Sequence, residues 1–514
     1  MLKRNLVKNL EALDRWEPYD VCVIGSGPAG TIVATQLAEQ GIRTVLLESG
    51  NSLVDWVADA RLKQLAEYEV SGDASYPLTR TTARVVGGNS NFWTGRCERF
   101  HPSDFEPHAY TPVGNPWPLG YSDIERYYAR AEETLRVRSG KLSKFAPPRR
   151  EGFPLPPRPK IDSLKRLMLS AGVTLDYSPT ATPARALRFF RVQREVLPRF
   201  IASANGTLVS GVTVTKLLHD DDSNIVGAEV KTLDGETRVA RARQYVVCCG
   251  GLQTPRLLLL SKTERFPDGI GNSHDRVGRG FNEHPSLNFY CKLRHSRSTL
   301  DLRHSIGRIH QYYDTCREEG LGAIHGVVIQ SWVFPSHFAR YRVIDMPKHF
   351  LKVVSRLARP SMWMSPTIEM KPRDENRVML SQSKRDSYGN PIPHLKLNFS
   401  EEDQRLLGRS RELFLAALER LGATDIEEAE FTWSRHHIGT CRMGDDPKAS
   451  VVDRDLRVHD CQNLYLCGSE VFVTGAAVQP VLTISAFALR LGEHLGRVIK
   501  SGSTRPAYRT AGSV

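Results

Sequence analysis

A glycine-rich turn near the amino end most constrains what this chain can fold into. The turn, residues 25–30 (GSGPAG), follows a run rich in Val and Ile at residues 19–24, which is typical of a buried parallel strand. Residues 31–40 then carry apolar side chains at helical spacing, and residues 43–47 form a second apolar run that ends at Glu48. The amino end therefore predicts a strand–helix–strand unit.

The spacing of the glycines in this turn predicts a site for the pyrophosphate of a dinucleotide. Gly25 permits the tight turn off the strand, Gly27 lets the backbone approach a pyrophosphate, and Gly30 lets helix and strand pack closely. The helix N-terminus offers free N–H groups and a positive dipole end. A carboxylate at Glu48 can accept hydrogen bonds from a ribose diol. The predicted nucleotide-binding residues are Gly25, Gly27, Pro28, Ala29, Gly30 and Glu48, and the motif alone does not separate FAD from NAD.

Composition and charge exclude several classes of protein. The chain has 514 residues, of which 40% are hydrophobic and 25% charged, and this suits a globular protein of two sequential or interleaved domains. No apolar run reaches the roughly 18 residues that a membrane span needs, so we expect no transmembrane segment. The net charge is +13, but Lys and Arg are spread along the chain. We therefore expect a solvated basic surface and no nucleic-acid partner.

Cysteine usage and the amino end indicate a cytoplasmic protein. The nine cysteines are an odd number, and no two of them form a CxxC pair. This pattern disfavours a disulfide framework and a zinc site, so we predict no metal site, and it fits a reducing cytosol. Residues 1–19 carry basic side chains but no apolar segment after them, which disfavours a secretory signal.

Further patterns predict additional strands and helices. We expect antiparallel strands over residues 207–215 and 224–231, buried strands over 244–249 and 464–468, and helices over 401–421 and 481–499. Residues 367–370, 377–380 and 394–398 predict strands of a second sheet. The Pro- and Arg-rich residues 145–159 predict a connection between domains.

Several segments far apart in the chain carry a family resemblance. They are RVVGGNSNFW at residues 84–93, VGRGFNEHP at 277–285, HHIGTCRMG at 436–444, LYLCGS at 464–469 and QPVLTI at 479–484. Together with the amino-terminal turn, this series resembles the glucose-methanol-choline (GMC) oxidoreductases, and its match covers both ends and the middle of the chain. The first segment is most similar to the pyranose oxidase and glycoside 3-dehydrogenase branch.

The resemblance implies an α/β fold with an α+β second domain. A Rossmann-like FAD-binding domain would be assembled from residues 1–100, 200–290 and 430–514. It would be interleaved with a substrate-binding domain of residues 101–199 and 291–429, built over an antiparallel sheet. The strands expected from the sequence pattern agree with that layout.

The resemblance also implies which cofactor the turn binds, because the family uses FAD. Further FAD contacts are implied at Arg84, Gly87, Gly88, Asn91, Gly468, Ser469 and Pro480. In related pyranose oxidases a histidine of the first segment bonds covalently to the flavin. The matching residue here is Phe92, so we expect non-covalent FAD. Phe92, Trp93 and Phe472 are candidates to line the substrate pocket, and equally candidates for the hydrophobic core.

Alcohol oxidation needs a base for the hydroxyl proton, and an imidazole with a pKa near neutrality suits that task. The resemblance places the family's base at His436, and the adjacent His437 is the competing candidate. Where the family usually has His or Asn to hold the substrate hydroxyl, this chain has Gln479. Gln donates and accepts as Asn does but is one methylene longer, so the hydroxyl is expected to sit differently or the pocket to be displaced.

The function that the resemblance implies is oxidation of a CH–OH group of a sugar or glycoside by hydride transfer to flavin N5. A redox-neutral lyase on the same fold, oxidation of a non-sugar alcohol, and a flavoprotein that only binds are the alternatives. The expected partners are a small-molecule alcohol or sugar and oxygen or another electron acceptor; the oligomeric state is open. Residues 348–359 place basic side chains on one helical stripe, which fits a surface helix, a membrane contact, an anionic carrier or an electron-transfer partner.

Overall fold

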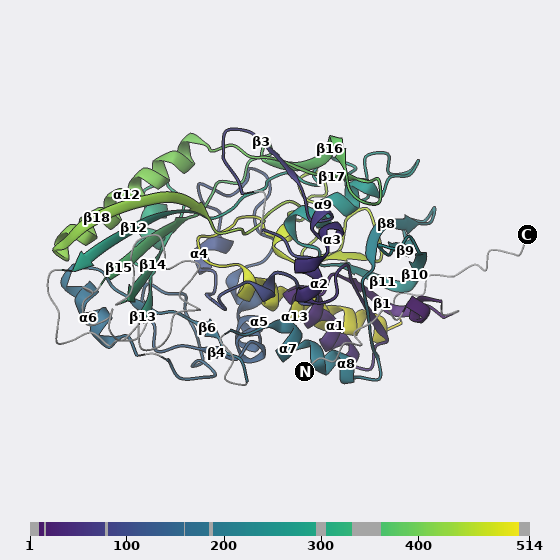
Figure 1. Cartoon of the computed structure of the whole chain (residues 1–514), viewed down its shortest axis with the longest axis horizontal. Coiled ribbons are helices and arrows are strands. Elements are labelled where there is room, and N and C mark those ends of the chain that lie inside the picture. The colour runs from purple at the N-terminus through teal and green to yellow at the C-terminus, as the bar shows by residue number, and fades with distance from the viewer. Residues whose placement is uncertain are drawn as a thin grey trace, which may run out of the picture.

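Two large sheets, one parallel and one antiparallel, lie toward opposite ends of the molecule in the computed structural model (Figure 1). The structure describes residues 10–14, 17–77, 81–158, 160–184, 189–293, 305–331 and 361–502. The basic stripe at residues 348–359 lies outside the described residues. Among the described residues, none of the helices combines the length and apolar composition that a membrane span requires.

The parallel sheet has five strands in the order β19-β11-β1-β2-β7. The strands are β1 (Tyr19–Ile24), β2 (Thr44–Glu48), β7 (Gly206–Ser210), β11 (Ala242–Val247) and β19 (Leu464–Leu466), all paired in parallel. Every side chain of β2 and β19 is buried, which explains their unbroken apolar sequences. The helices α1 (Pro28–Glu39) and α13 (Val481–Lys500) pack against each other, and α5 (Tyr121–Thr134) packs on α13. Chain segments from both ends and the middle thus build one sheet.

The antiparallel sheet has six strands in the order β18-β12-β15-β14-β13-β5. They are β5 (Asp176–Tyr177), β12 (Pro285–Leu293), β13 (Ser305–Ile309), β14 (Ile324–Ser331), β15 (Ser361–Ile368) and β18 (Ala423–Trp433). The helix α12 (Glu401–Arg420) covers one face, where Phe289 and Met364 join its apolar cluster. Side chains alternate between the two faces along a strand, so the polar residues next to these apolar ones lie on the face away from α12. This polar face looks toward the parallel sheet.

Smaller elements surround the two sheets. Two three-stranded sheets are β10-β9-β8, with β8 (Thr213–His219), β9 (Ile225–Lys231) and β10 (Thr237–Ala240), and β16-β17-β3, with β3 (Glu69–Ser71), β16 (Arg377–Arg385) and β17 (Pro391–Lys396). A two-stranded sheet pairs β4 (Val137–Arg138) with β6 (Thr180–Ala181). The remaining helices are α2 (Leu53–Ala58), α3 (Ala60–Gln64), α4 (Pro102–Phe105), α6 (Asp162–Ser170), α7 (Val192–Glu195), α8 (Leu197–Ala202), α9 (Gly250–Leu260), α10 (Tyr313–Glu318) and the 3-10 turns η1 (Leu10–Leu13), η2 (Gly88–Asn91) and η3 (Ser469–Val471).

The predicted fold class is confirmed, with corrections to individual strands. The strand predicted over residues 207–215 is wrong: it is two strands, β7 in the parallel sheet and β8 in a separate sheet. Gly211 has φ +76°, a left-handed conformation that ends the first strand. The strands at residues 367–370, 377–380 and 394–398 do not share a sheet, because β15 joins the six-stranded sheet while β16 and β17 pair with β3. The domain boundaries stay predictions; β12 and β18 run across those at residues 290 and 430.

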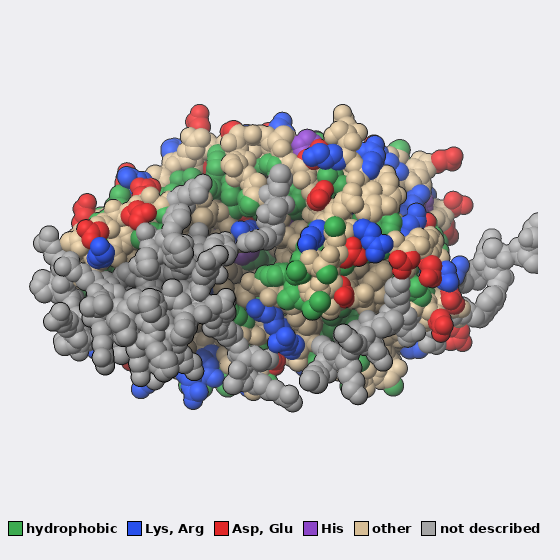
Figure 2. All heavy atoms as spheres, in the orientation of Figure 1, with side chains coloured by type: hydrophobic (Ala, Val, Ile, Leu, Met, Phe, Trp, Pro, Cys, Tyr) green, Lys and Arg blue, Asp and Glu red, His purple; other side chains and the backbone are tan. Residues whose placement is uncertain are grey.

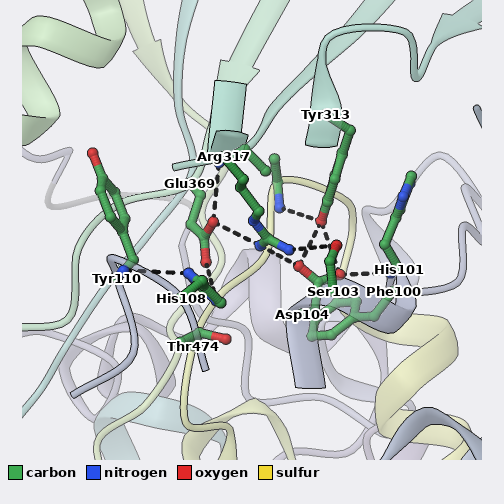
Figure 3. Close-up of polar contacts among 12 residues, drawn as sticks. Phe100, His101, Ser103, Asp104, His108, Tyr110, Tyr313, Arg317, Glu369 and Thr474 are labelled. Carbon is green, nitrogen blue, oxygen red and sulfur yellow. Dashed lines mark hydrogen bonds and ion pairs between the residues drawn. The ribbon is translucent and has the colours of Figure 1, made fainter. Parts of the chain in front are cut away.

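A buried ionic cluster joins α4 to the antiparallel sheet (Figure 3). Arg317 of α10 pairs with Asp104 of α4, and its guanidinium donates to Glu369 Oε2 at 2.8 Å. Tyr313, one turn earlier in α10, donates its hydroxyl to the Asp104 carboxylate at 3.0 Å. Asp104, Tyr313 and Glu369 are fully buried, and the Arg317 side chain is only 6% exposed. Removing one of the four would therefore leave a buried charge or hydroxyl without its partner. The cluster therefore fixes how α4 and α10 meet.

Candidate active site

A cavity of about 1360 Å³ reaches from the carboxyl ends of the parallel strands to the polar face of the antiparallel sheet. Ligands of open α/β sheets bind at that end of the strands. The volume exceeds the usual range for a single small molecule, so it suits a dinucleotide together with a substrate. In Figure 2, hydrophobic side chains gather over α2, near the centre of the view. Two residues of this helix, Trp56 and Val57, line the cavity.

The phosphate turn has the shape that a pyrophosphate requires. A Cβ on Gly25 would lie 2.6 Å from the Cys248 carbonyl oxygen, and a Cβ on Gly30 would lie 1.9 Å from the Gly25 carbonyl oxygen. A Cβ on Gly27 would meet no atom within 4 Å. No side chain caps the first turn of α1, which begins at Pro28 rather than at the predicted Thr31. The uncapped helix N-terminus thus faces open space, which fits a bound phosphate.

Glu48 and Arg84 lie at one end of the same cavity. The Glu48 carboxylate accepts hydrogen bonds from the Ser26 backbone N–H at 3.0 Å and the Ser26 hydroxyl at 2.7 Å. Burial raises the pKa of Glu48. Arg84 donates to Ser49 Oγ and Gln253 Oε1, each at 3.0 Å. The Gln253 amide nitrogen is buried and has no partner among the described residues, which leaves a donor for a polar ligand.

The loop at residues 87–91 packs directly on the phosphate turn. A Cβ on Gly88 would lie 3.2 Å from Gly27 Cα, and the Gly87 backbone N–H donates to Ser26 Oγ at 3.0 Å. The Asn91 amide donates to the Val86 and Gly88 carbonyls at 3.1 and 2.9 Å. Asn91 is therefore used within the loop, and it supports the cavity wall from behind.

Twelve of the fifteen predicted site residues line the cavity: Gly25, Gly27, Pro28, Ala29, Glu48, Arg84, Gly88, His436, Gly468, Ser469, Gln479 and Pro480. The other three, Gly30, Gly87 and Asn91, lie behind it. Of the aromatic candidates, Phe92 and Trp93 line the cavity, whereas Phe472 is fully buried in the core. The unpaired Gln253 amide nitrogen and the open glycine turn both fit FAD, with the diphosphate of FAD at residues 25–30. The roles of these residues stay predictions.

His436 lies in the cavity wall and pairs with a histidine from another segment. Its Nδ1 is 2.8 Å from Nδ1 of His284, and Nε2 of His284 is 2.9 Å from the Gly475 carbonyl oxygen. Burial lowers the pKa of His436 well below 6.5, and the nearby His284, His437 and Arg96 side chains disfavour a second positive charge there. A neutral imidazole in the wall of the cavity is the form that accepts a proton.

The competing candidate, His437, also lines the cavity. Its Nε2 is buried without a partner among the described residues, and burial lowers its pKa to about 4. The backbone carbonyl of His437 accepts the Ser469 hydroxyl at 2.7 Å. The geometry therefore leaves His437 with an unused nitrogen but without the histidine partner that His436 has.

Glu283, which the sequence did not single out, holds the loop that carries His436. Its carboxylate accepts the backbone N–H groups of His284 at 2.9 Å and Ser434 at 3.1 Å, and a short hydrogen bond from the His436 N–H. Burial raises the pKa of Glu283 to about 8. Glu283 and His284 both belong to the segment VGRGFNEHP, which marked the family but gave no signal of a role.

The polar face of the antiparallel sheet forms the wall opposite the phosphate turn. The wall residues are Ser286, Asn288, Trp363, Ser365, Thr367 and Thr432. The Trp363 indole N–H donates to Asn288 Oδ1 at 3.1 Å, and the hydroxyls of Ser286 and Thr367 lie 2.9 Å apart. Polar and apolar side chains alternate along residues 285–293 and 361–368, and this alternation could have predicted the polar wall from the sequence.

Arg96 adds a positive charge to the cavity wall. No carboxylate among the described residues lies within ion-pair distance of its guanidinium, and burial with the nearby Arg308 lowers its pKa to about 9. Glu98, two residues further on, is engaged by Arg308 at 2.6 Å. Hydroxyl, amide, indole and guanidinium groups together make a wall suited to a molecule rich in hydroxyls.

A glycine turn that fits a diphosphate and a neutral imidazole lie in the wall of one cavity, an arrangement that fits a nucleotide-dependent oxidoreductase. Two models of the GMC oxidoreductase family match residues 187–286 and 372–488, and a model of an FAD-binding domain matches residues 18–57. The chain belongs to the GMC oxidoreductase family, and FAD is its cofactor. The predictions of family, enzyme class and cofactor are confirmed.

Curated relatives and a solved structure cover nearly the whole chain. Paromamine 6'-oxidase of Streptomyces fradiae is 28% identical, over 92% of this chain and 90% of its own. The fructose dehydrogenase large subunit of Gluconobacter japonicus is 24% identical, over 94% of this chain and 98% of its own. The structure of pyridoxine 4-oxidase from Mesorbium loti superposes with a TM-score of 0.63 at 20% identity, over 93% of this chain and 99% of that one. Nothing in these comparisons supports the lyase alternative.

Proposed function

We propose that this enzyme oxidises a CH–OH group of a sugar or glycoside, with His436 as the base for the hydroxyl proton. The observation that carries the proposal is that His436 and Gln479 line the same cavity as the phosphate turn, opposite a sheet wall of hydroxyl and amide groups. FAD, when bound, supplies the acceptor for the hydride that leaves the substrate carbon. The names of the two relatives above, an oxidase of paromamine and a dehydrogenase of fructose, support a sugar substrate.

His436 and Gln479 have complementary tasks in this proposal. His436, neutral because burial lowers its pKa, accepts the proton of the substrate hydroxyl. Gln479 Oε1 is buried without a partner among the described residues, and the Gln479 amide orients the same hydroxyl. A polyol that leaves either group unpaired would be rejected, because an unsatisfied buried polar group costs about 1–3 kcal/mol.

The cofactor is held without a covalent bond in this proposal. Phe92 stands where related pyranose oxidases carry the histidine that bonds to the flavin, and a phenyl ring offers no nucleophilic atom. Acid precipitation of the holoenzyme tests this directly. Flavin released into the supernatant is the expected result, and flavin retained by the pellet would contradict it.

Anaerobic bleaching of the flavin absorption by candidate substrates tests the reaction. A panel of free sugars, glycosides and simple alcohols should show bleaching by members of the first two classes. His436→Ala should slow the bleaching about 10²–10⁴-fold, the usual worth of a general base. His437→Ala serves as the matched variant and should slow it far less. Bleaching by simple alcohols alone would move the substrate outside the sugars, and an unaffected His436→Ala would remove its role as base.

The electron acceptor follows from the same sample after bleaching. Rapid return of the flavin absorption on admitting air identifies an oxidase, whereas slow return in air and rapid return with a quinone or dye identifies a dehydrogenase. The cytoplasmic location stays a prediction.

A further inference from the structure

The contact between His284 and His436 bears on where the proton of each imidazole lies. Residues 152 apart in the sequence place two Nδ1 atoms 2.8 Å from each other, with the rings nearly perpendicular at 80°. His284 is fully buried, whereas His436 reaches the cavity. A hydrogen bond between two nitrogens needs a proton on one of them and a lone pair on the other.

The other nitrogen of His284 decides which of the two carries the proton. Nε2 of His284 is 2.9 Å from the Gly475 carbonyl oxygen, and a carbonyl only accepts hydrogen bonds. Nε2 of His284 therefore carries a proton. Burial lowers the pKa of His284 to about 4, so the ring is neutral and its Nδ1 has a lone pair. Nδ1 of His436 must then be the donor, which leaves Nε2 of a neutral His436 without a proton.

Residues on both sides of Gly475 are held by hydrogen bonds to other elements. The Trp117 indole N–H donates to Thr474 Oγ1 at 3.0 Å, and the Ala477 backbone N–H donates to Tyr313 Oη at 3.1 Å. Tyr313 belongs to the buried ionic cluster of Figure 3, which also shows Thr474 close by. The acceptor that sets the tautomer of His284 thus lies in a segment that is hydrogen-bonded to other elements on both sides.

We propose that His284 is a positioning residue that fixes the tautomer and ring orientation of His436, so that Nε2 of His436 is the atom that takes the substrate proton. This proposal rests on the proposed function of His436. In the step, the substrate O–H bond breaks and an N–H bond forms at Nε2, while the proton on Nδ1 stays in the hydrogen bond to His284. In many catalytic sites that pair a nucleophile with a base, a third group, often a carboxylate, orients the base. In this proposal, His284 orients His436 in the same way, as a neutral imidazole.

Two substitutions of His284 separate orientation from packing. In His284→Asn, the amide oxygen can take the place of Nδ1 and accept from His436, so the rate of anaerobic flavin bleaching should stay within a few-fold of the parent. In His284→Leu, no acceptor is left, and the bleaching rate should fall roughly 10- to 100-fold, the loss that is typical when the hydrogen-bond partner of a metal-bound imidazole is removed. The substrate concentration for half-maximal bleaching should stay nearly the same in both variants.

His310→Leu is the matched control. His310 is also fully buried and also pairs with a histidine, since its Nδ1 is 3.1 Å from Nε2 of His101, but it does not line the cavity. It should lose thermal stability and keep the parent's bleaching rate. If His284→Leu binds FAD and bleaches at the parent's rate, the proposal is overturned. If His436→Ala also bleaches normally, the proposed function fails with it, whereas a slow His436→Ala confines the failure to His284.

A neutron structure of the unmodified holoenzyme tests the tautomer without any substitution. The expected map shows deuterium on Nδ1 of His436, on Nε2 of His284, and none on Nε2 of His436. Deuterium on Nε2 of His436 in the oxidised enzyme would overturn the proposal, whatever the variants do. This measurement remains decisive even if His284→Leu does not fold.

Discussion

Replacing two glycines of the phosphate turn, one at a time, should separate cofactor binding from folding. Gly27→Ala adds a Cβ that meets no protein atom within 4 Å, and Gly27 has an ordinary φ of −63°. Gly30→Ala adds the same methyl group 1.9 Å from the Gly25 carbonyl oxygen, a backbone atom that cannot swing away. The two variants differ by three positions and carry the same chemical change.

The expected magnitudes follow from those contacts. Gly30→Ala overpacks the helix against the turn, which costs about 1–3 kcal/mol of apoprotein stability. Gly27→Ala should change apoprotein stability by less than about 1 kcal/mol, because the stiffer unfolded chain offsets the poorer N-cap residue. The methyl group of Gly27→Ala occupies the space left for the pyrophosphate. Losing one charge-assisted hydrogen bond there costs about 1.5–3 kcal/mol, or roughly 10- to 100-fold in the Kd of FAD.

Two measurements on the apoprotein complete the experiment. Quenching of FAD fluorescence on titration gives Kd, and thermal unfolding followed by circular dichroism gives Tm. Gly27→Ala should bind FAD weakly at a nearly unchanged Tm, and Gly30→Ala should unfold at lower temperature. If Gly27→Ala binds FAD as tightly as the parent, the pyrophosphate does not lie at Gly27. If Gly27→Ala unfolds at as low a temperature as Gly30→Ala, the space beside Gly27 is not open.

Two predictions concern pH. The pKa of His436 is lowered well below 6.5, so the imidazole stays neutral at moderately acid pH. We therefore expect kcat/KM to stay constant from pH 8 to below 6.5. An inflection of kcat/KM at or above pH 6.5 would contradict this. The pKa of Glu283 is raised to about 8, against about 4.3 in the unfolded chain, so the folded state holds a proton that the unfolded state has lost between these values. The contribution of Glu283 to the free energy of unfolding is fully present below pH 4.3 and is lost as pH rises toward 8. The total loss is on the order of 5 kcal/mol. Glu283→Gln should flatten that fall in denaturant-unfolding free energy, and an unchanged slope would assign it to other groups.

Local patterns predicted the nucleotide end well, because its signal lies within a few residues. The strand, the glycine turn and the helix of residues 19–39 follow one another without interruption, so the sequence alone indicates both fold and ligand. The strand predicted over residues 207–215 failed because alternation continues across Gly211, whose left-handed φ of +76° is invisible in the pattern. Adjacent strands of one pattern thereby fall into different sheets.

The surroundings of the base could not be predicted in the same way. His284 and His436 meet because β12 begins beside the segment that precedes His436, and no local pattern records a contact across 152 residues. The Glu283 carboxylate accepts backbone N–H groups, and Gly475 offers a backbone carbonyl oxygen. These backbone groups are nearly the same for every residue type, so the sequence does not show which of them Glu283 and His284 bind.

The strand β19 sits at one edge of the parallel sheet, yet it is made almost last. Its partner β11 is complete some two hundred residues earlier on the growing chain, as residues 242–247 precede residues 464–466. Long-range parallel pairing is slow, and an unpaired apolar strand invites aggregation. A ribosome translating this chain therefore carries an unfinished nucleotide domain for much of synthesis. A chain that ends before residue 464 lacks β19, so we expect it to bind chaperones or be degraded and to have no activity.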